Sequence, residues 1–240
     1  MRWNRHHFEN KETIVTILCP DCTLKQGVNA LNRARNVLES YISLDPEFQR
    51  AEHPYDVPRN APPLIRKMCE DAAKVGVGPM ATVAGALASE SLTAILEAGA
   101  KEAVVDNGGD IALMVRKPVR VGIFAGRASA NGLAFDILPR SRPLGICTSS
   151  GTVGPSLSYG CADAAVVVSS NILLADAAAT ALGNRVKSKD DLETCFDFLE
   201  NIAQVEGAMV ILGNRVALWG QLPSLIRTRI DTNLITRGKN

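Results

Sequence analysis

The chain has 240 residues, of which 46% are hydrophobic and 21% charged, so it is long and apolar enough to form a globular core. Its formal net charge of +1 gives no reason to expect binding to nucleic acid or to an anionic membrane surface. The N-terminus lacks the apolar segment of a secretory signal, and we find no uncharged apolar run of about 18 residues. We therefore expect a cytoplasmic protein without a membrane-spanning helix.

Hydrophobic periodicity predicts the elements at the start of the chain. Residues 12–19 alternate between apolar and polar side chains, as a strand does, and residues 24–42 place an apolar stripe at helical spacing. The prolines and charges of residues 43–63 predict a long link. A helix is expected over residues 62–75.

The next predicted helix, residues 80–98, consists almost wholly of small side chains. Gly85 lowers the stability of this helix relative to alanine, which indicates that another element approaches closely there. Gly78 lies in a Gly-x-Gly pattern directly before the helix, where a backbone can bind an anion or a ligand. An ordinary loop entering a helix has the same pattern, so both interpretations of Gly78 stay open.

The second half of the chain is predicted to consist mainly of strands. Strands are expected at 102–106, 110–115, 119–124, 132–137, 144–148 and 163–169, helices at 173–185 and 189–203, and a hairpin at 208–212 and 215–219. Short connections that contain glycine favour antiparallel neighbours, and the polar tail after Pro223 is expected to be loosely held. The order predicts an α+β fold, a mainly antiparallel sheet covered by helices, in one domain made of residues 1–75, 76–185 and 186–240.

The first candidate binding motif is a turn between two predicted strands, with Asn107, Gly108, Gly109 and Asp110 after Asp106. The two glycines allow a positive φ and let a ligand approach the backbone, while the polar side chains flank it. A plain hairpin turn explains the same residues without a ligand, because Asn-Gly is its strongest short signal.

A second motif lies at the end of the strand predicted at 144–148 and supplies a dense set of hydrogen-bond donors. Its members are Cys147, Thr148, Ser149, Ser150, Gly151 and Thr152. Backbone N–H groups and hydroxyls of this kind hold phosphates, although the lysine of a P-loop is absent. A solvated loop is an equally good interpretation.

Asp176 and Thr180 are the polar residues of the segment from Leu174 to Gly183, and they are four residues apart. On a helix this spacing places both side chains on one face. A carboxylate beside a hydroxyl suits Mg²⁺, which prefers oxygen ligands. The alternative is structural, with Asp176 capping a helix end and Thr180 bonding to the preceding turn.

The chain has six cysteines, which in a cytoplasmic protein argue against a disulfide scaffold. Cys19 and Cys22 form a Cys-x-x-Cys pair after a predicted strand, but the second pair of a zinc site is absent. They are either a reactive dithiol or two ordinary thiols. Cys147 and Cys161 are further candidates for thiol chemistry, since Cys147 lies among the donors of the second motif.

Taken in order, these motifs resemble the ApbE-like family, the FAD:protein FMN transferases. The resemblance covers residues 76–185 and is most specific in the segment from Leu174 to Leu182. It implies that Asp176 and Thr180 bind Mg²⁺, and that Gly78 and the two donor motifs bind an FAD-like nucleotide. The transferases also carry a lysine near residues 80–90 and a His-x-x-Asp-Pro-x-Thr-Gly stretch, both absent here. The chain is therefore more similar to the shorter cytoplasmic branch of the family, in which some members have been linked to sulfur assimilation into homocysteine.

Two functions follow from the resemblance. The first is a divergent FMN transferase that uses Mg²⁺ and acts on a protein substrate, with Asp110 or Asp163 as the base. The second is an accessory protein in sulfide incorporation, in which thiols such as Cys147 act with a sulfur-metabolism partner. Formation of a homo-oligomer is left open by the sequence.

Overall fold

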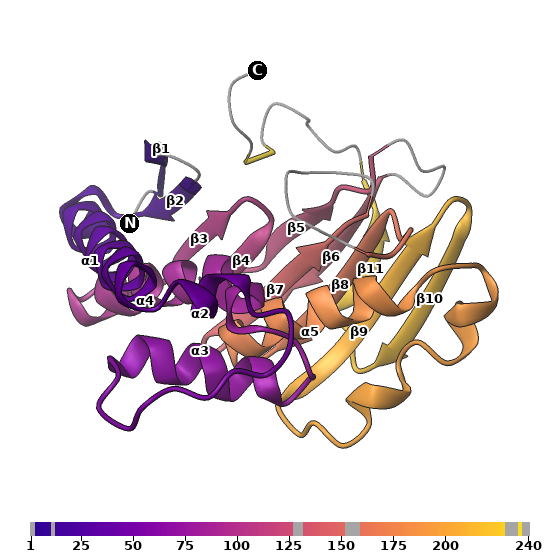
Figure 1. The fold of residues 1–240 in the computed structure, drawn as a ribbon. Helices are drawn as coiled ribbons and strands as arrows, with labels where there is room; N and C mark the ends of the chain where they lie inside the picture. Colours follow the sequence, from indigo (N-terminus) through magenta and orange to yellow (C-terminus); the bar gives the residue numbers. More distant parts are fainter. Residues whose placement is uncertain (1–2, 11–12, 127–131, 152–158, 229–234, 237–240) are drawn as a thin grey trace.

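The computed structural model describes residues 3–10, 13–126, 132–151, 159–228 and 235–236, and Figure 1 shows the fold. An eight-stranded sheet has the order β1-β2-β3-β4-β7-β8-β9-β10. Its strands are β1 (Asn4–Asn10), β2 (Thr13–Cys19), β3 (Ala103–Asn107), β4 (Asp110–Met114), β7 (Leu144–Ser149), β8 (Ala164–Ser169), β9 (Val205–Leu212) and β10 (Arg215–Gly220). Neighbouring strands pair antiparallel, which confirms the predicted α+β class.

A three-stranded sheet of order β11-β6-β5 covers part of one face of the large sheet. Its strands are β5 (Val119–Ile123), β6 (Leu133–Ile137) and β11 (Ser224–Arg227). Phe135 of β6 is fully buried in the apolar cluster that this sheet shares with β7, β8 and β9.

Helices cover the other face of the large sheet (Figure 1). They are α1 (Asp21–Leu44), α2 (Pro46–Arg50), α3 (Pro63–Ala73), α4 (Val83–Glu97) and α5 (Ile172–Arg185), with 3₁₀ turns η1 (Pro79–Thr82), η2 (Asp190–Glu193) and η3 (Asp197–Leu199). Along β8, Ala165 and Val167 pack under the helices, while Val166 and Val168 face the small sheet. Burial on both faces explains why the sequence of β8 is continuously apolar.

Helix α4 lies between α1 and α5 and contacts both of them. Together η1 and α4 (Pro79–Glu97) are long and apolar enough to cross a membrane by composition alone, which the sequence analysis did not expect. Over half of this stretch (56%) is buried inside the fold, as in the core helix of a globular domain.

Two predictions about secondary structure are wrong. The expected helix over residues 189–203 is replaced by η2 and η3, because the Asp191 carboxylate accepts the N–H groups of Lys187 and Ser188 and so stabilises a turn. Strand β1 was not expected, since its residues are mostly polar. It lies at the sheet edge, where Phe8 supplies a partly buried apolar contact and pairing with β2 supplies the rest.

The polar tail after Pro223 is partly ordered, contrary to expectation. Strand β11 pairs with β6, and Thr236 is buried against the large sheet. Thr236 Oγ1 lies 2.6 Å from Asp106 Oδ2 and 2.9 Å from Thr16 Oγ1. The end of the chain is therefore attached to β2 and β3 by side-chain hydrogen bonds that the sequence pattern does not reveal.

Gly145 of β7 provides a test of how tightly α5 packs on the sheet. A Cβ at this position would lie 2.8 Å from Ile172 Cα and 3.1 Å from Ala175 Cβ, so the backbone of α5 would have to move. We expect Gly145→Ala to lower the free energy of unfolding by about 1–3 kcal/mol in urea titrations. A loss below about 0.5 kcal/mol would contradict this account of the packing.

Candidate functional site

Asp176 joins the two central helices of the fold. It lies in the second turn of α5, is 7% exposed, and its Oδ2 accepts a hydrogen bond from the Gly85 N–H at 2.8 Å. Gly85 belongs to the first turn of α4, whose N–H groups have no partner within the helix. The carboxylate therefore caps α4 across a tertiary contact, and the sequence did not show which helix end Asp176 would cap.

The glycine at position 85 is required by this contact. A Cβ there would lie 2.9 Å from Asp176 Cβ and 2.9 Å from the Ile172 carbonyl oxygen. The close approach expected for Gly85 is thus a contact with α5, and it brings α4 near enough for its backbone to bind the carboxylate.

The β3–β4 turn forms a second connection to the start of α4. Asn107 pairs with Asp110, and Gly108 and Gly109 have φ angles of 67° and 106°, as a two-residue hairpin turn requires. The Asn107 side-chain amide donates to the Ala84 carbonyl oxygen at 3.0 Å. The hairpin interpretation is correct, and the same turn also positions a polar side chain at the helix.

Asp110 is the first residue of β4 and contacts the end of β7. Its Oδ1 accepts the Thr148 N–H at 3.3 Å, and Cys147 lies beside it. The Cys147 thiol is fully buried and donates to the Ile172 carbonyl oxygen at 3.7 Å. The β3–β4 turn, the end of β7 and α5 thus bring Asp110, Cys147 and Asp176 near one another.

The surroundings of Asp110, Cys147 and Asp176 disfavour the ionised forms of their side chains. Burial raises the pKa of Asp110 to about 7. Burial, and then the negative charge of Asp110, raise the pKa of Asp176 well above its usual value, and backbone N–H groups of α4 oppose the shift. Burial and the two carboxylates also raise the pKa of the Cys147 thiol, so it is a poor nucleophile.

The hydroxyl residues of the predicted site lie along the same edge of α5. Thr180 is half-buried one turn after Asp176, as the four-residue spacing predicts. Ser149 packs under Gly183, where a Cβ would lie 3.1 Å from Ser149 Oγ. Ser150 is half-buried at the end of β7, and Thr152 lies outside the described residues.

Three of the predicted site residues have other contacts. Gly78 packs on the backbone of Ala51, where a Cβ would lie 1.7 Å from the carbonyl oxygen, and Gly151 packs similarly on Gly160. Asp163 Oδ2 accepts the Gly213 N–H at 2.7 Å in the β9–β10 turn. The structure therefore explains these residues by packing and turn formation, and Asp163 is not part of the Asp110–Asp176 cluster.

The sequence analysis missed a polar network at the start of α5. Asn171 caps this helix through Leu174 N and also donates to Asp71 of α3 at 2.8 Å. An asparagine before an apolar helical run is a recognisable N-cap signal. No local signal marks Asp71, which is 100 residues away in the chain.

Within the described ranges, no group of three or more His, Cys, Asp or Glu side chains is arranged to hold a metal ion. Any cation bound at Asp176 would need hydroxyl, backbone or ligand oxygens in addition to carboxylates. Such a donor set is typical of Mg²⁺ and not of zinc.

Asp110 should make the stability of the metal-free protein depend on pH. The pKa of Asp110 is about 7 in the folded protein and has an ordinary value of 3.8. The contribution of Asp110 to the free energy of unfolding is therefore fully present below pH 3.8 and is lost as the pH rises through about 7. We expect the free energy of unfolding to fall over this interval and to fall less in Asp110→Asn. Urea titrations in the presence of a chelator measure both slopes, and identical slopes would contradict the burial of this carboxyl group.

Removal of the Asp176 acceptor should destabilise α4. Asp176→Ala leaves the buried Gly85 N–H without its partner, and we expect a loss of about 1–3 kcal/mol in the free energy of unfolding. Asp176→Asn retains an acceptor oxygen and removes the buried charge, so its loss should be smaller. Equal losses in Asp176→Asn and Asp176→Ala would show that the charge, and not the hydrogen bond, holds α4.

Comparison with known proteins identifies the family and the fold. The chain is 48% identical to a UPF0280 protein of Methanocella arvoryzae (96% of this chain, 94% of the relative) and 45% identical to one of Methanothrix thermoacetophila (98% and 99%). The fold is similar to flavin transferase ApbE from Vibrio cholerae, with a TM-score of 0.60 at 12% identity over 92% of this chain and 98% of that one. It is also similar to the ApbE protein of Thermotoga maritima, with a TM-score of 0.55 at 11% identity over 99% and 100%. A family model described as "AbpE bacteria" matches residues 2–195, and the chain therefore belongs to this family, within the ApbE fold.

Proposed function

We propose that the protein binds FAD or a related flavin nucleotide with Mg²⁺ at the Asp110–Asp176 cluster and acts as a divergent FMN transferase. One observation carries the proposal. Two carboxylates, from the half-buried Asp110 of β4 and the buried Asp176 of α5, lie near each other, and burial is the main cause that raises the pKa of both. The flavin transferases that share this fold support the choice of ligand.

The residues present fit a magnesium ion by the chemistry of their donors. Asp110 and Asp176 have no ion pair with a basic side chain among the described residues, and burial disfavours their charged forms. Asp176 and Thr180 would hold the ion, with Asp110 beside them. Bound there, Mg²⁺ would supply charge neutralisation for the pyrophosphate of the nucleotide.

The surrounding backbone suits the nucleotide itself. A Cβ at Gly108 or Gly109 would meet no atom within 4 Å, so the space beside this turn is open to a ligand. The N-terminus of α4 favours negative charge through the helix dipole. The turn, the helix end and the donors after Thr148 would together position the phosphates.

Asp110 is the proposed base for the acceptor hydroxyl of a protein substrate. Its pKa of about 7 lies near neutral pH, where a general base is most effective. Asp163, the other candidate from the sequence, is occupied by the Gly213 N–H and is not proposed. The deprotonated Asp110 would accept the hydroxyl proton as the oxygen attacks the phosphorus and the AMP phosphate leaves.

The sulfur-assimilation alternative has less support from the geometry. A persulfide carrier needs an accessible thiol with a low pKa, whereas Cys147 is buried and its pKa is raised. Cys19 is also buried with a raised pKa, which leaves Cys22 as the exposed member of the Cys-x-x-Cys pair. We therefore place the flavin nucleotide ahead of thiol chemistry.

Titration with FAD, followed by flavin fluorescence with and without Mg²⁺, tests the proposal. We expect FAD to bind and Mg²⁺ to strengthen the binding. Asp176→Asn and Thr180→Val should remove the effect of Mg²⁺, whereas Asp163→Asn, the matched control outside the cluster, should retain it. With a threonine-bearing acceptor protein, Asp110→Asn should lower the rate of AMP release by about 10²-fold or more.

The outcomes separate binding from catalysis. Absence of FAD binding under both conditions would refute the proposal entirely. Binding that depends on Mg²⁺ but gives no AMP with any acceptor would retain the site and remove the transferase activity. An unchanged Mg²⁺ effect in both Asp176→Asn and Thr180→Val would place the ion elsewhere.

A further inference from the structure

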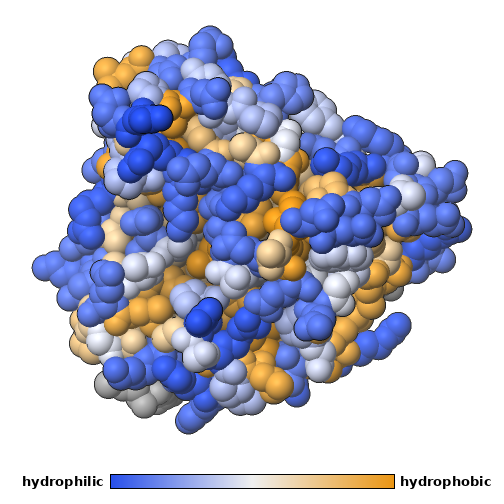
Figure 2. Space-filling model, turned by 90° about the horizontal axis from the view of Figure 1, so that it is seen from below, coloured by the Kyte–Doolittle hydropathy of each residue, from blue (hydrophilic) through white to orange (hydrophobic). Residues whose placement is uncertain are grey.

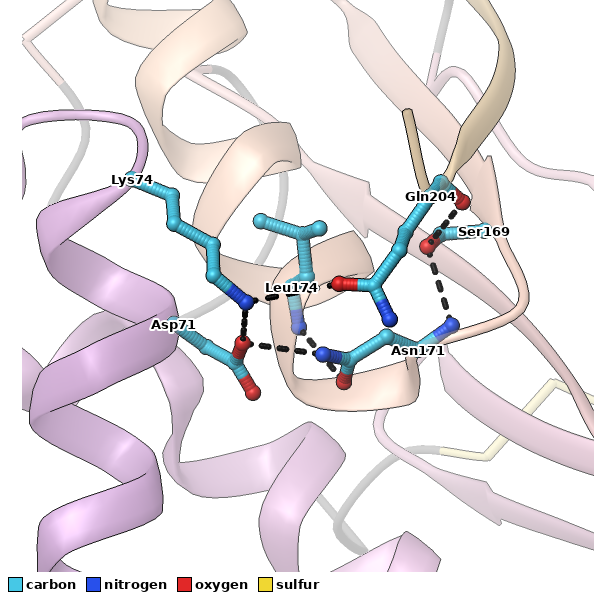
Figure 3. Close-up of polar contacts among 6 residues, drawn as sticks. All are labelled: Asp71, Lys74, Ser169, Asn171, Leu174 and Gln204. Atoms are coloured by element: carbon cyan, nitrogen blue, oxygen red, sulfur yellow. Dashed lines mark hydrogen bonds and ion pairs between the residues drawn. The ribbon is translucent and has the colours of Figure 1, made fainter. Parts of the chain in front are cut away.

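Two carboxylates that the proposed flavin site does not include join segments far apart in the chain. The first is Asp71 of α3, a helix on the side of the molecule whose surface is mostly hydrophilic with smaller apolar areas (Figure 2). It accepts hydrogen bonds from the Lys74 and Asn171 side chains and so connects α3 to the start of α5 (Figure 3). The second is Asp106 of β3, and one of its partners is a backbone N–H of the β3–β4 turn.

Asp106 restrains the β3–β4 turn by a hydrogen bond to its backbone. The Asp106 Oδ1 atom accepts the Gly109 N–H at 2.9 Å. A Cβ at Gly108 or Gly109 would meet no described atom within 4 Å, so side-chain packing does not fix these two glycines. Glycine loses more conformational freedom on ordering than any other residue. The bond from Gly109 to Asp106 is therefore a main restraint on the conformation of this turn.

The Asn107 side chain restrains the same turn from the other face of the sheet. It donates to the Ala84 carbonyl oxygen of α4 at 3.0 Å, on the face that the helices cover. Successive residues of a strand point to opposite faces, so Asp106 faces away from the helices. It also faces away from Asp110, which is the hairpin partner of Asn107. Asp106 therefore acts on the proposed site through the backbone of Gly109 and not by direct contact.

Thr236, in the C-terminal tail, binds the second oxygen of Asp106. Its Oγ1 lies 2.6 Å from Asp106 Oδ2 and 2.9 Å from Thr16 Oγ1, and the residue is 6% exposed. Thr16 is the partner of Asp106 in the register of β2 and β3, so Thr236 lies across these two strands. A hydroxyl that donates to a carboxylate at such a distance forms a strong, charge-assisted hydrogen bond.

The orientation of the Asp106 carboxylate depends on both of these bonds. Gly109 donates to Oδ1 and Thr236 donates to Oδ2. Burial raises the pKa of Asp106, while the two hydrogen bonds and the charge of Arg5 oppose the rise, so both donors favour the carboxylate form. Without the Thr236 hydroxyl, Oδ2 loses this donor and the carboxylate can rotate about χ2 toward another one. The Gly109 N–H then loses its acceptor for part of the time.

We propose that Thr236 is a positioning residue of the proposed flavin site, which holds the β3–β4 turn, through Asp106, in the conformation that receives the phosphates of the nucleotide. The inference rests on the proposed function, because it gives the C-terminal tail a role at that same site. Asn107 restrains the turn from α4 and Asp106 restrains it from the opposite face. Only the second restraint depends on the tail, so loss of the Thr236 hydroxyl loosens the turn and leaves the fold intact.

Exchange of the Gly109 amide hydrogen with solvent, measured by NMR on the full chain without FAD or Mg²⁺, tests the restraint on the turn. Thr236→Val removes the hydroxyl at nearly constant volume and should raise this exchange rate at least about fivefold, the factor expected for the loss of one hydrogen bond. Thr236→Ser keeps the hydroxyl and should stay within about twofold of the wild type.

Two controls separate this effect from a general loss of stability. Thr228→Val replaces a half-buried threonine of the same tail, directly after β11, and should leave the Gly109 exchange rate unchanged. The Gly213 N–H is the internal control, because it also lies in a hairpin turn and is bound by a carboxylate, Asp163 Oδ2, at 2.7 Å. Its exchange rate should be the same in Thr236→Val as in the wild type.

Titration with FAD in the presence of Mg²⁺ tests the consequence for the site. Thr236→Val should weaken FAD binding about fivefold, while Thr236→Ser and Thr228→Val should bind FAD as the wild type does. In an Asp106→Ala background, Thr236→Val should cause no further loss of affinity, because its effect passes through that carboxylate. The comparison of Thr236→Ser with Thr236→Val decides the question if Asp106→Ala does not fold.

An unchanged Gly109 exchange rate in Thr236→Val, an equal rise at Gly213, or the same rise in Thr236→Ser would each overturn the proposal. Faster exchange at Gly109 with unchanged affinity for FAD would overturn it as well. Absence of FAD binding by the wild type would refute the flavin site and with it the role of Thr236 there. The exchange rates, which need neither FAD nor Mg²⁺, would still show whether Thr236 holds the turn.

Discussion

The contact between the Asp176 carboxylate and the Gly85 N–H is the constraint on which the rest of the structure depends. It connects the second turn of α5 to the first turn of α4 at 2.8 Å. Both helices lie on the same face of the large sheet, and α4 also packs on α1. A carboxylate can occupy this position because the orphan N–H groups of a helix end stabilise it where water is excluded.

Small residues make this contact sterically feasible. Gly85 admits Asp176, and Gly145 of β7 admits the backbone of Ile172, with under 3 Å between an added Cβ and its neighbours in both cases. Five of the 14 residues of α5 are alanines. Helix α5 therefore lies close to the large sheet. The start of β4 and the end of β7 lie beside this helix, which carries Asp176. The geometry of the cluster is thus a consequence of side-chain size as much as of charge.

The same cluster is costly for the fold alone. The half-buried Asp110 and the buried Asp176 lie near each other, and burial raises the pKa of both. The charged forms of these two side chains are therefore disfavoured unless a cation balances them. The Asp71 network at the start of α5 likewise leaves one buried oxygen unsatisfied.

The sequence by itself determined most of the strands and the antiparallel α+β class, because local periodicity and turn glycines are read within short windows. It also predicted that Gly85 marks a close approach. Only the tertiary structure decided which element approaches there, that Gly78 and Asp163 serve packing and a turn, and that residues 189–203 form 3₁₀ turns. These features depend on contacts between residues far apart in the chain. The stability of such contacts depends on burial and on the hydrogen bonds that cross them. Neither can be predicted from a local pattern of side chains.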